Sequence, residues 1–191
     1  MKKVLILAFF VTCALFSFAQ TESEHLTFKG VPIDGTLSEY VEKMKAAGFS
    51  YLGEEDGTAV LEGDFAGYKG CKIIVSTLKS KDLVNYIGVI FPGNEKWWSA
   101  EKDYNELKSM LTEKYGKPSE SVEKFHGYQP NTESEKKRKL MTDKYTWFST
   151  FSTPKGNIEL FIRYQLDIHV VLRYSDKINS ESIRAHAIED L

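Results

Sequence analysis

The sequence is poor in cysteine and lacks the local motifs of the common catalytic and metal sites. Cysteine occurs only at Cys13 and Cys71, and Cys13 falls within a predicted export signal. The mature chain can therefore form neither an internal disulfide nor a metal site built on several thiolates. No G-x-S-x-G, P-loop, G-x-G-x-x-G or H-E-x-x-H pattern occurs. We expect no metal, no cofactor and no catalytic residue.

The histidines are few as well, and none is spaced from another as metal ligands are. The four are His25, His126, His169 and His186. We interpret each as a surface or half-buried side chain, with His25 in a flexible N-terminus. Cys71 opens a predicted strand and is interpreted as a small packed residue. An alternative joins Cys71 and His169 in one site, which requires the two side chains to meet in space.

The sequence also has no strong charge bias. Lysine and arginine number 25 against 27 aspartates and glutamates, which gives a formal net charge of -2, and 42% of the residues are hydrophobic. This composition excludes collagen-like, coiled-coil and wholly disordered chains, and it argues against a dedicated nucleic-acid binder. The basic run at 136–139 follows Glu133 and Glu135, which offset it, so we expect an exposed loop or short helix there.

One long apolar run lies at the N-terminus and predicts an export signal. Two lysines precede a stretch that is shorter than the ~20 apolar residues that span a membrane. The stretch ends in Ser-Phe-Ala at 17–19, with small residues at 17 and 19, the two positions that a signal peptidase reads. We expect residues 1–19 to be removed and the protein to be periplasmic or secreted, with no transmembrane span. A lipid anchor at Cys13 is not expected, because the residues before it match a lipoprotein signal poorly.

The remaining sequence predicts a helix followed by strands, twice. Residues 20–35 are interpreted as an extended lead-in. In the first half, 36–94, a capping box at Thr36 and Glu39 predicts the start of a helix. The second half, 95–176, begins with a helix capped by Ser99, and a last helix lies within 177–191. Alternation and turn residues predict strands at about 50–55, 58–65, 71–78, 83–91, 121–126, 145–152, 157–164 and 168–174.

The two halves align through their glycines. Gly48 and Gly116 each end a predicted helix, and Gly70 and Gly156 each stand in a turn before a strand. The polar segment 127–143 accounts for the extra length of the second half as an insertion. The pattern therefore predicts an α+β fold with antiparallel sheets packed by helices, and it suggests a tandem α-β-β-β-β duplication.

Two neighbouring tryptophans, Trp97 and Trp98, precede the second helix. Adjacent residues cannot both face the core, so we expect one to be partly exposed. One interpretation is a helix-entry staple in which one indole packs back on the first turn. The other is an aromatic platform for a sugar or for a side chain of a partner. Trp147 alternates with Tyr145 on a strand, which favours the core.

The final predicted hairpin places apolar side chains on its outward face. If 165–167 is its loop, residues whose numbers sum to 332 face one another. The outward pairs are then Glu159 with Arg173, Phe161 with Val171, and Arg163 with His169. Apolar residues between polar pairs are either covered by the terminal helix, through Ile183 and Ile188, or form a binding patch.

Six segments of the sequence carry a family resemblance: Phe-Lys-Gly-Val-Pro-Ile-Asp-Gly at 28–35, Gly-Asp-Phe-Ala-Gly at 63–67, Val-Ile-Phe-Pro at 89–92, Lys-Tyr-Gly-Lys-Pro at 114–118, the strand of Trp147, and Lys-Gly-Asn-Ile at 155–158. Together they resemble an uncharacterised family of small secreted proteins from gut Bacteroidetes. The resemblance spans most of 28–176, and the family has no assigned activity. The helix-plus-four-strands arrangement is also similar to the beta-lactamase-inhibitor-protein and outer-membrane-assembly lipoprotein folds, a likeness of fold alone.

Two functions remain open from the sequence. The first is an exported, non-catalytic binding module of the cell envelope or secreted space, whose partner is another protein. The second is a small hydrolase or glycan-binding protein with a site assembled from scattered Glu, His, Tyr and Trp residues. A flat apolar patch favours the first, and a cleft with two suitably separated carboxylates favours the second. The candidate binding residues are Trp97, Trp98, Phe161, Arg163, His169 and Val171.

Overall fold

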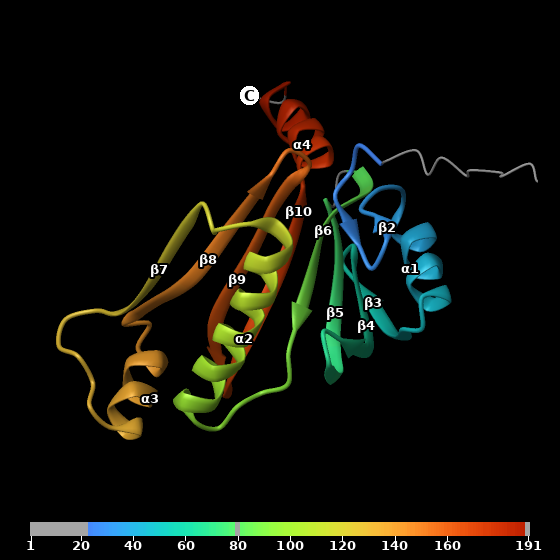
Figure 1. The fold of residues 1–191 in the computed structure, drawn as a ribbon. Helices are drawn as coiled ribbons and strands as arrows, with labels where there is room; N and C mark the ends of the chain where they lie inside the picture. Colours follow the sequence, from blue (N-terminus) through green and yellow to red (C-terminus); the bar gives the residue numbers. More distant parts are fainter. Residues whose placement is uncertain (1–22, 79–80, 190–191) are drawn as a thin grey trace, which may run out of the picture.

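The computed structural model describes residues 23–78 and 81–189 (Figure 1). The predicted export signal at 1–19, with Cys13, lies outside the described residues and stays a prediction. In the described part, no helix is both long and apolar enough to cross a membrane.

The chain forms a small hairpin, then a helix and four strands, and then a second helix and four strands with a further helix inserted. The first part comprises β1 (Thr27–Phe28), β2 (Val31–Pro32), α1 (Leu37–Ala46), β3 (Ser50–Glu55), β4 (Thr58–Phe65), β5 (Tyr68–Leu78) and β6 (Lys81–Ile90). The second part comprises α2 (Trp97–Tyr115), β7 (Glu120–Phe125), α3 (Glu133–Met141), β8 (Tyr145–Thr153), β9 (Gly156–Gln165), β10 (Asp167–Asp176) and α4 (Lys177–Glu189).

All strands after the N-terminal hairpin belong to one antiparallel sheet of eight strands. Its order is β3-β4-β5-β6-β10-β9-β8-β7, so each half contributes four neighbouring strands and the last strands of the two halves, β6 and β10, pair at the centre. The predicted α+β class is confirmed, and the order helix, four strands is present in both halves. The two halves therefore share one sheet rather than forming separate domains with separate sheets.

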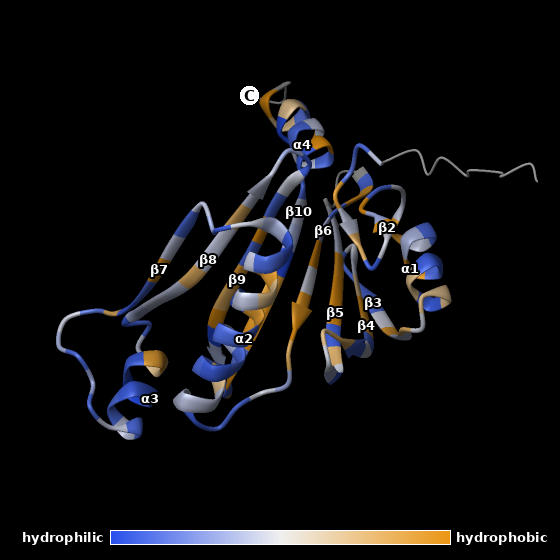
Figure 2. Cartoon of the chain, viewed as in Figure 1, coloured by the Kyte–Doolittle hydropathy of each residue, from blue (hydrophilic) through white to orange (hydrophobic). Residues whose placement is uncertain are grey.

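Helices α1 and α2 cover the same face of this sheet. Side chains directly opposite one another in paired strands lie on one face, and the buried row Leu61, Ile73, Val89, Leu172, Leu160 and Ser149 runs across six strands in this way. Leu61 and Ile73 belong to the same buried cluster as the inward residues of both helices, among them Tyr40 and Tyr104. Figure 2 shows the apolar residues concentrated along β5, β6 and β9. The opposite side of the sheet, called here the open face, is not covered by α1 or α2.

Local sequence signals account for several elements. Thr36 accepts a hydrogen bond from the Glu39 N–H and Glu39 accepts one from the Thr36 N–H, which is the predicted capping box of α1. Asp56 and Gly57 both have positive φ, as a tight hairpin turn between β3 and β4 requires.

One predicted boundary is wrong because a tertiary contact replaces the local signal. Helix α2 begins at Trp97 and not after Ser99, and its N-terminal N–H of Trp97 donates to Glu133 Oε2 at 2.9 Å. Helix α4 begins at Lys177, within the expected range 177–191, and its start is capped locally, because Asp176 accepts a hydrogen bond from the Asn179 N–H at 2.9 Å.

His25 is not in a flexible segment, as the sequence suggested. Its Nδ1 lies 3.1 Å from the carboxylate of Asp176, which is fully buried and also accepts the Leu26 N–H. Asn179 of α4 donates to the carbonyls of Ile33 and Val84. The N-terminal hairpin is thereby tied to the end of β10 and to α4.

Candidate binding face

The open face carries a continuous row of apolar side chains across five strands. The register pairs Val122 with Phe148, Phe148 with Phe161, Phe161 with Val171, and Val171 with Ile90. Each member is therefore a direct cross-strand neighbour of the next, on β7, β8, β9, β10 and β6. We call this set the apolar row.

The apolar row is only partly shielded from water. Val171, at its centre, is 8% exposed, and the other four members are half-buried. Ile74 and Val60, a pair on β5 and β4, are also half-buried and face the same side; Ile74 lies two residues along β5 from Lys72, the cross-strand neighbour of Ile90. Along the strands of a half-solvated sheet, the residues that face water are ordinarily polar, so this surface is apolar where polar residues are expected.

Charged residues border the apolar row on one side. Arg173 and Glu159 face each other across β10 and β9, as the sequence predicted, and Arg173 Nε donates to Glu159 Oε2 at 2.8 Å. The Arg173 guanidinium also lies 5.7 Å from the centre of the Phe161 ring. The pair is largely solvated, so it contributes about 0–1 kcal/mol to stability and mainly orients the arginine over the ring.

Arg163 borders the row on the other side and makes no ion pair with any described residue. It faces His169 in the register, as predicted. An open pocket of about 570 Å³ lies between this arginine and Phe148, and Glu159, Phe161 and Asp143 also line it. The pocket thus combines two aromatic rings with an unpaired guanidinium, which fits a ligand that is apolar and carries an anionic group.

His169 is held by the backbone. Its Nδ1 donates to the carbonyl oxygen of Phe91 at 3.0 Å, and the side chain is half-buried. Cys71 lies on the helix-covered face and is fully buried, whereas His169 lies on the open face. The two side chains are on opposite sides of the sheet, so the alternative that joined them in one site is wrong. Burial also raises the pKa of the Cys71 thiol, which disfavours the reactive thiolate.

The two tryptophans separate as the sequence predicted, but Trp97 is not a binding residue. Its indole is 1% exposed and its ring centre lies 4.6 Å from that of Trp147 and 4.9 Å from that of Phe125. An indole packed in this way offers no surface to a ligand. Trp98 is 55% exposed, but it stands on α2, which covers the other face of the sheet. Trp98 therefore does not belong to the candidate face.

The terminal helix does not cover the apolar row. Helix α4 stands at the end of the sheet where β10 finishes (Figure 1). Ile183 is half-buried there and Ile188 is exposed, so neither side chain covers Phe161. The interpretation in which the terminal helix buries the outward face of the hairpin is therefore wrong.

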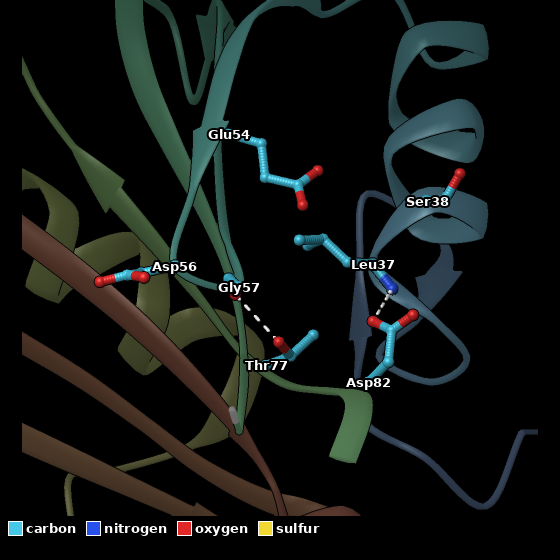
Figure 3. Close-up of a pocket in the computed structure, with 7 residues that line it drawn as sticks. All are labelled: Leu37, Ser38, Glu54, Asp56, Gly57, Thr77 and Asp82. Carbon is cyan, nitrogen blue, oxygen red and sulfur yellow. Dashed lines mark hydrogen bonds between the residues drawn. The ribbon is translucent and has the colours of Figure 1, made fainter. Parts of the chain in front are cut away.

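The acidic hairpin at Glu54 and Asp56 forms a second concave site, of about 410 Å³, with Asp82 and the start of α1. Figure 3 shows Glu54 pointing toward Leu37 while Asp56 points away from it. Asp82 is already engaged, because it accepts the Leu37 N–H at 2.9 Å. Among the described residues, no group of three or more His, Cys, Asp and Glu is placed to hold a metal ion.

A polar cluster between α2 and β7–β8 was not predicted from the sequence. The Tyr104 hydroxyl lies 2.7 Å from the Ser149 Oγ, which lies 2.8 Å from the Ser121 Oγ, and Lys108 Nζ donates to Ser121 at 3.0 Å. Lys108 is also ion-paired with Glu123, so its ammonium acts as a donor and not as a base for either serine. The cluster satisfies buried polar groups under α2 and carries no nucleophile that we can assign.

Sequence periodicity alone could have found part of the apolar row. Trp147 was placed in the core, and residue 148 must then face outward on the same strand. The alignment of Phe148, Val122 and Ile90 with the predicted pair Phe161 and Val171 depends on strand order, which no local signal encodes. Comparison with protein-family models, curated proteins and solved structures finds no match, so the resemblance to a secreted Bacteroidetes family stays a prediction.

Proposed function

We propose that this chain is an exported, non-catalytic binding module that docks a partner protein on the open face. The observation that carries the proposal is the apolar row, in which five apolar side chains adjoin across five strands without a helix over them. A surface of this kind is a mark of an interaction site on a soluble domain.

The charges at the border of the row define the chemistry of the partner. Arg163 has no carboxylate partner among the described residues, whereas Arg173 is neutralised by Glu159. A partner that seats apolar side chains on Phe148 and Phe161 and brings one carboxylate to Arg163 would satisfy both the apolar surface and the free cation. The partner is thus a protein segment with an acidic residue beside apolar ones.

The alternative, a glycan-binding or hydrolytic protein, is favoured by one feature of the same pocket. Asp143 and Glu159 both line it next to aromatic rings. Glu159 is held in the ion pair with Arg173, however, so it is engaged and does not stand free beside Asp143 as the second carboxylate that glycoside hydrolysis uses. A glycan therefore remains the alternative to a partner protein as the ligand of this pocket.

The test is affinity capture from envelope extracts with matched variants. Phe161→Ser and Arg163→Gln alter the open face, and Trp98→Ser removes an exposed aromatic residue from the opposite side. We expect one protein to be retained by the wild type and by Trp98→Ser and to be lost with both open-face variants. Retention of the same proteins by all four chains would contradict the proposal. Elution of the captured material by free sugar, or capture of a glycan without protein, would favour the alternative.

A further inference from the structure

The inserted segment between β7 and β8 forms a second concave site with an unusual charge balance. A pocket of about 630 Å³ lies between α3 and the adjoining ends of β7 and β8. The titratable side chains that line it are all bases or phenols, with no carboxylate among them: His126, Tyr128, Arg138, Lys139 and Lys144. We call this the basic pocket.

The two glutamates of the segment do not line the basic pocket, although they adjoin its bases in the sequence. Glu135 is committed to the start of its own helix, where it accepts the N–H groups of Asn131 at 2.8 Å and of Thr132 at 3.3 Å. Glu133 accepts the Trp97 N–H at the start of α2 and lies 3.9 Å from Lys136. The expectation that these glutamates offset the basic run holds in part, because Glu133 is ion-paired with Lys136, but neither carboxylate lines the basic pocket.

Lys139 carries a charge that is buried without a carboxylate. The residue is 4% exposed, and its Nζ donates to the backbone carbonyl of His126 and lies 3.8 Å from the centre of the Tyr128 ring. A carbonyl and an aromatic ring solvate an ammonium, but they supply no negative charge. A buried charge is normally paired, and breaking such a pair is costly. Among the described residues, the buried ammonium of Lys139 therefore has a carbonyl and an aromatic ring beside it but no carboxylate.

Two further cations stand at the mouth of the basic pocket. Arg138 donates to the Tyr128 hydroxyl and forms no ion pair with a described residue, and Lys144 is exposed and unpaired as well. Asp143, their neighbour in the sequence, lines the pocket on the open face instead. A guanidinium and two ammonium groups around one opening suit a tetrahedral oxyanion, which offers several acceptor oxygens and up to two negative charges.

We propose that the basic pocket binds a phosphate or sulfate group, with Arg138 and Lys144 contacting its oxygens and Lys139 supplying the buried positive charge. This site is separate from the open face and does not depend on the function proposed there. The shared chemistry is the tetrahedral oxyanion, which can be a free inorganic ion or the ester group of a small sugar phosphate.

The test is calorimetric titration of the protein with sodium phosphate, sodium sulfate and a hexose phosphate, with sodium chloride used to keep the ionic strength constant. We expect saturable binding to the protein. Arg138→Gln and Lys144→Gln should each weaken it about tenfold, as the loss of one charge-assisted contact does. Tighter binding of the hexose phosphate than of inorganic phosphate would identify the ester as the source, and the reverse order would identify the free ion.

Lys137→Gln is the matched control, because Lys137 is exposed on the same helix and does not line the pocket. It removes the same charge and should leave the affinity within twofold of the wild type. Equal weakening by Lys137→Gln would show that binding follows net charge alone and would overturn the proposal. Absence of saturable binding to phosphate, sulfate and hexose phosphate alike would overturn it too.

Discussion

At the scale of single residues, neighbouring positions of one strand point to opposite faces of the sheet and differ in burial. On β9, Leu160 is fully buried under α2, while Phe161 is half-buried on the open face. This alternation follows from the pleat, and the register of β9 with β10 was predictable because the connection at Leu166 is short. For Trp97 and Trp98 the sequence predicted that one indole is buried and the other partly exposed, but it does not say which of the two enters the core.

We expect Phe161→Ser to cost less stability than a substitution in the core, because the Phe161 side chain is already partly exposed to water. The loss in the free energy of unfolding should be about 1 kcal/mol, against 2–5 kcal/mol for Leu160→Ala on the buried side of the same strand. Urea denaturation of the two variants measures the difference. Equal losses would mean that Phe161 is a core residue and that the open face is covered in the native protein.

Gly156 is required by packing as well as by its backbone conformation. Its φ is +149°, and a Cβ at this position would fall against the backbone carbonyl oxygen of Ser175, well inside van der Waals contact. We expect Gly156→Ala to destabilise the protein by more than about 3 kcal/mol or to prevent folding, since a backbone atom cannot move aside as a side chain can.

Gly116→Ala is the control for that substitution, because Gly116 also has a positive φ, of +84°, but has open space around the position of a Cβ. With ψ at -172° this backbone conformation is adopted almost only by glycine, so the cost should be about 1–3 kcal/mol, from the backbone conformation alone. Thermal or urea unfolding compares the two. If both alanine variants lose the same stability, the contact with Ser175 is not what requires glycine.

At the scale of helices and strands, long-range contacts set what local signals leave open. The capping boxes of α1 and α3 are local and can be read from the sequence, as Thr36 with Glu39 shows. The cap of α2 is not local, because Glu133 reaches it from a helix that follows β7. Lys108 and Glu123 pair between α2 and β7 in the same way. The contact of Glu133 decides where α2 begins, and the pair of Lys108 and Glu123 joins α2 to β7.

The capping box of α3 predicts that the stability of this helix depends on pH. The N–H groups of Asn131 and Thr132 hold the pKa of Glu135 below its usual range. A carboxyl whose pKa is lowered on folding stabilises the folded state, and this contribution is complete above the pKa of the unfolded chain, about 4.3. The contribution is lost as the pH falls through the lower pKa of the folded state. We expect the amides of α3 to lose protection from hydrogen exchange below about pH 4, after correction for intrinsic rates. Glu135→Gln, which keeps the acceptor but not the charge, should flatten this dependence, and an unchanged profile would exclude Glu135 as its cause.

At the scale of the whole molecule, the α+β class and the repeated helix-plus-strands order were predictable, and the way the halves join was not. The order of elements follows from periodicity, capping and turn residues, all of which are local. The central pairing of β6 with β10 joins segments far apart in the sequence, and it is this pairing that extends the apolar row from Val171 to Ile90. The candidate face therefore exists only in the assembled sheet, which is why the sequence yielded Phe161 and Val171 but not the whole row.

Export of the whole molecule is predicted from the apolar run at its N-terminus. If residues 1–19 are an export signal, the protein recovered from outside the cytoplasm should begin near Gln20. N-terminal sequencing of that protein is the measurement. An intact Met1 on the exported protein would contradict the predicted cleavage.

The docking of a partner protein on the open face is tested most directly by photo-crosslinking in the producing cells. A photoreactive phenylalanine analogue is placed at Phe148, in the apolar row, and separately at Trp98 on the opposite side of the sheet. We predict a discrete protein adduct from position 148 that Arg163→Gln reduces, and no such adduct from position 98. No adduct from position 148, or the same adducts from both positions, would contradict the assignment of the open face as the binding surface.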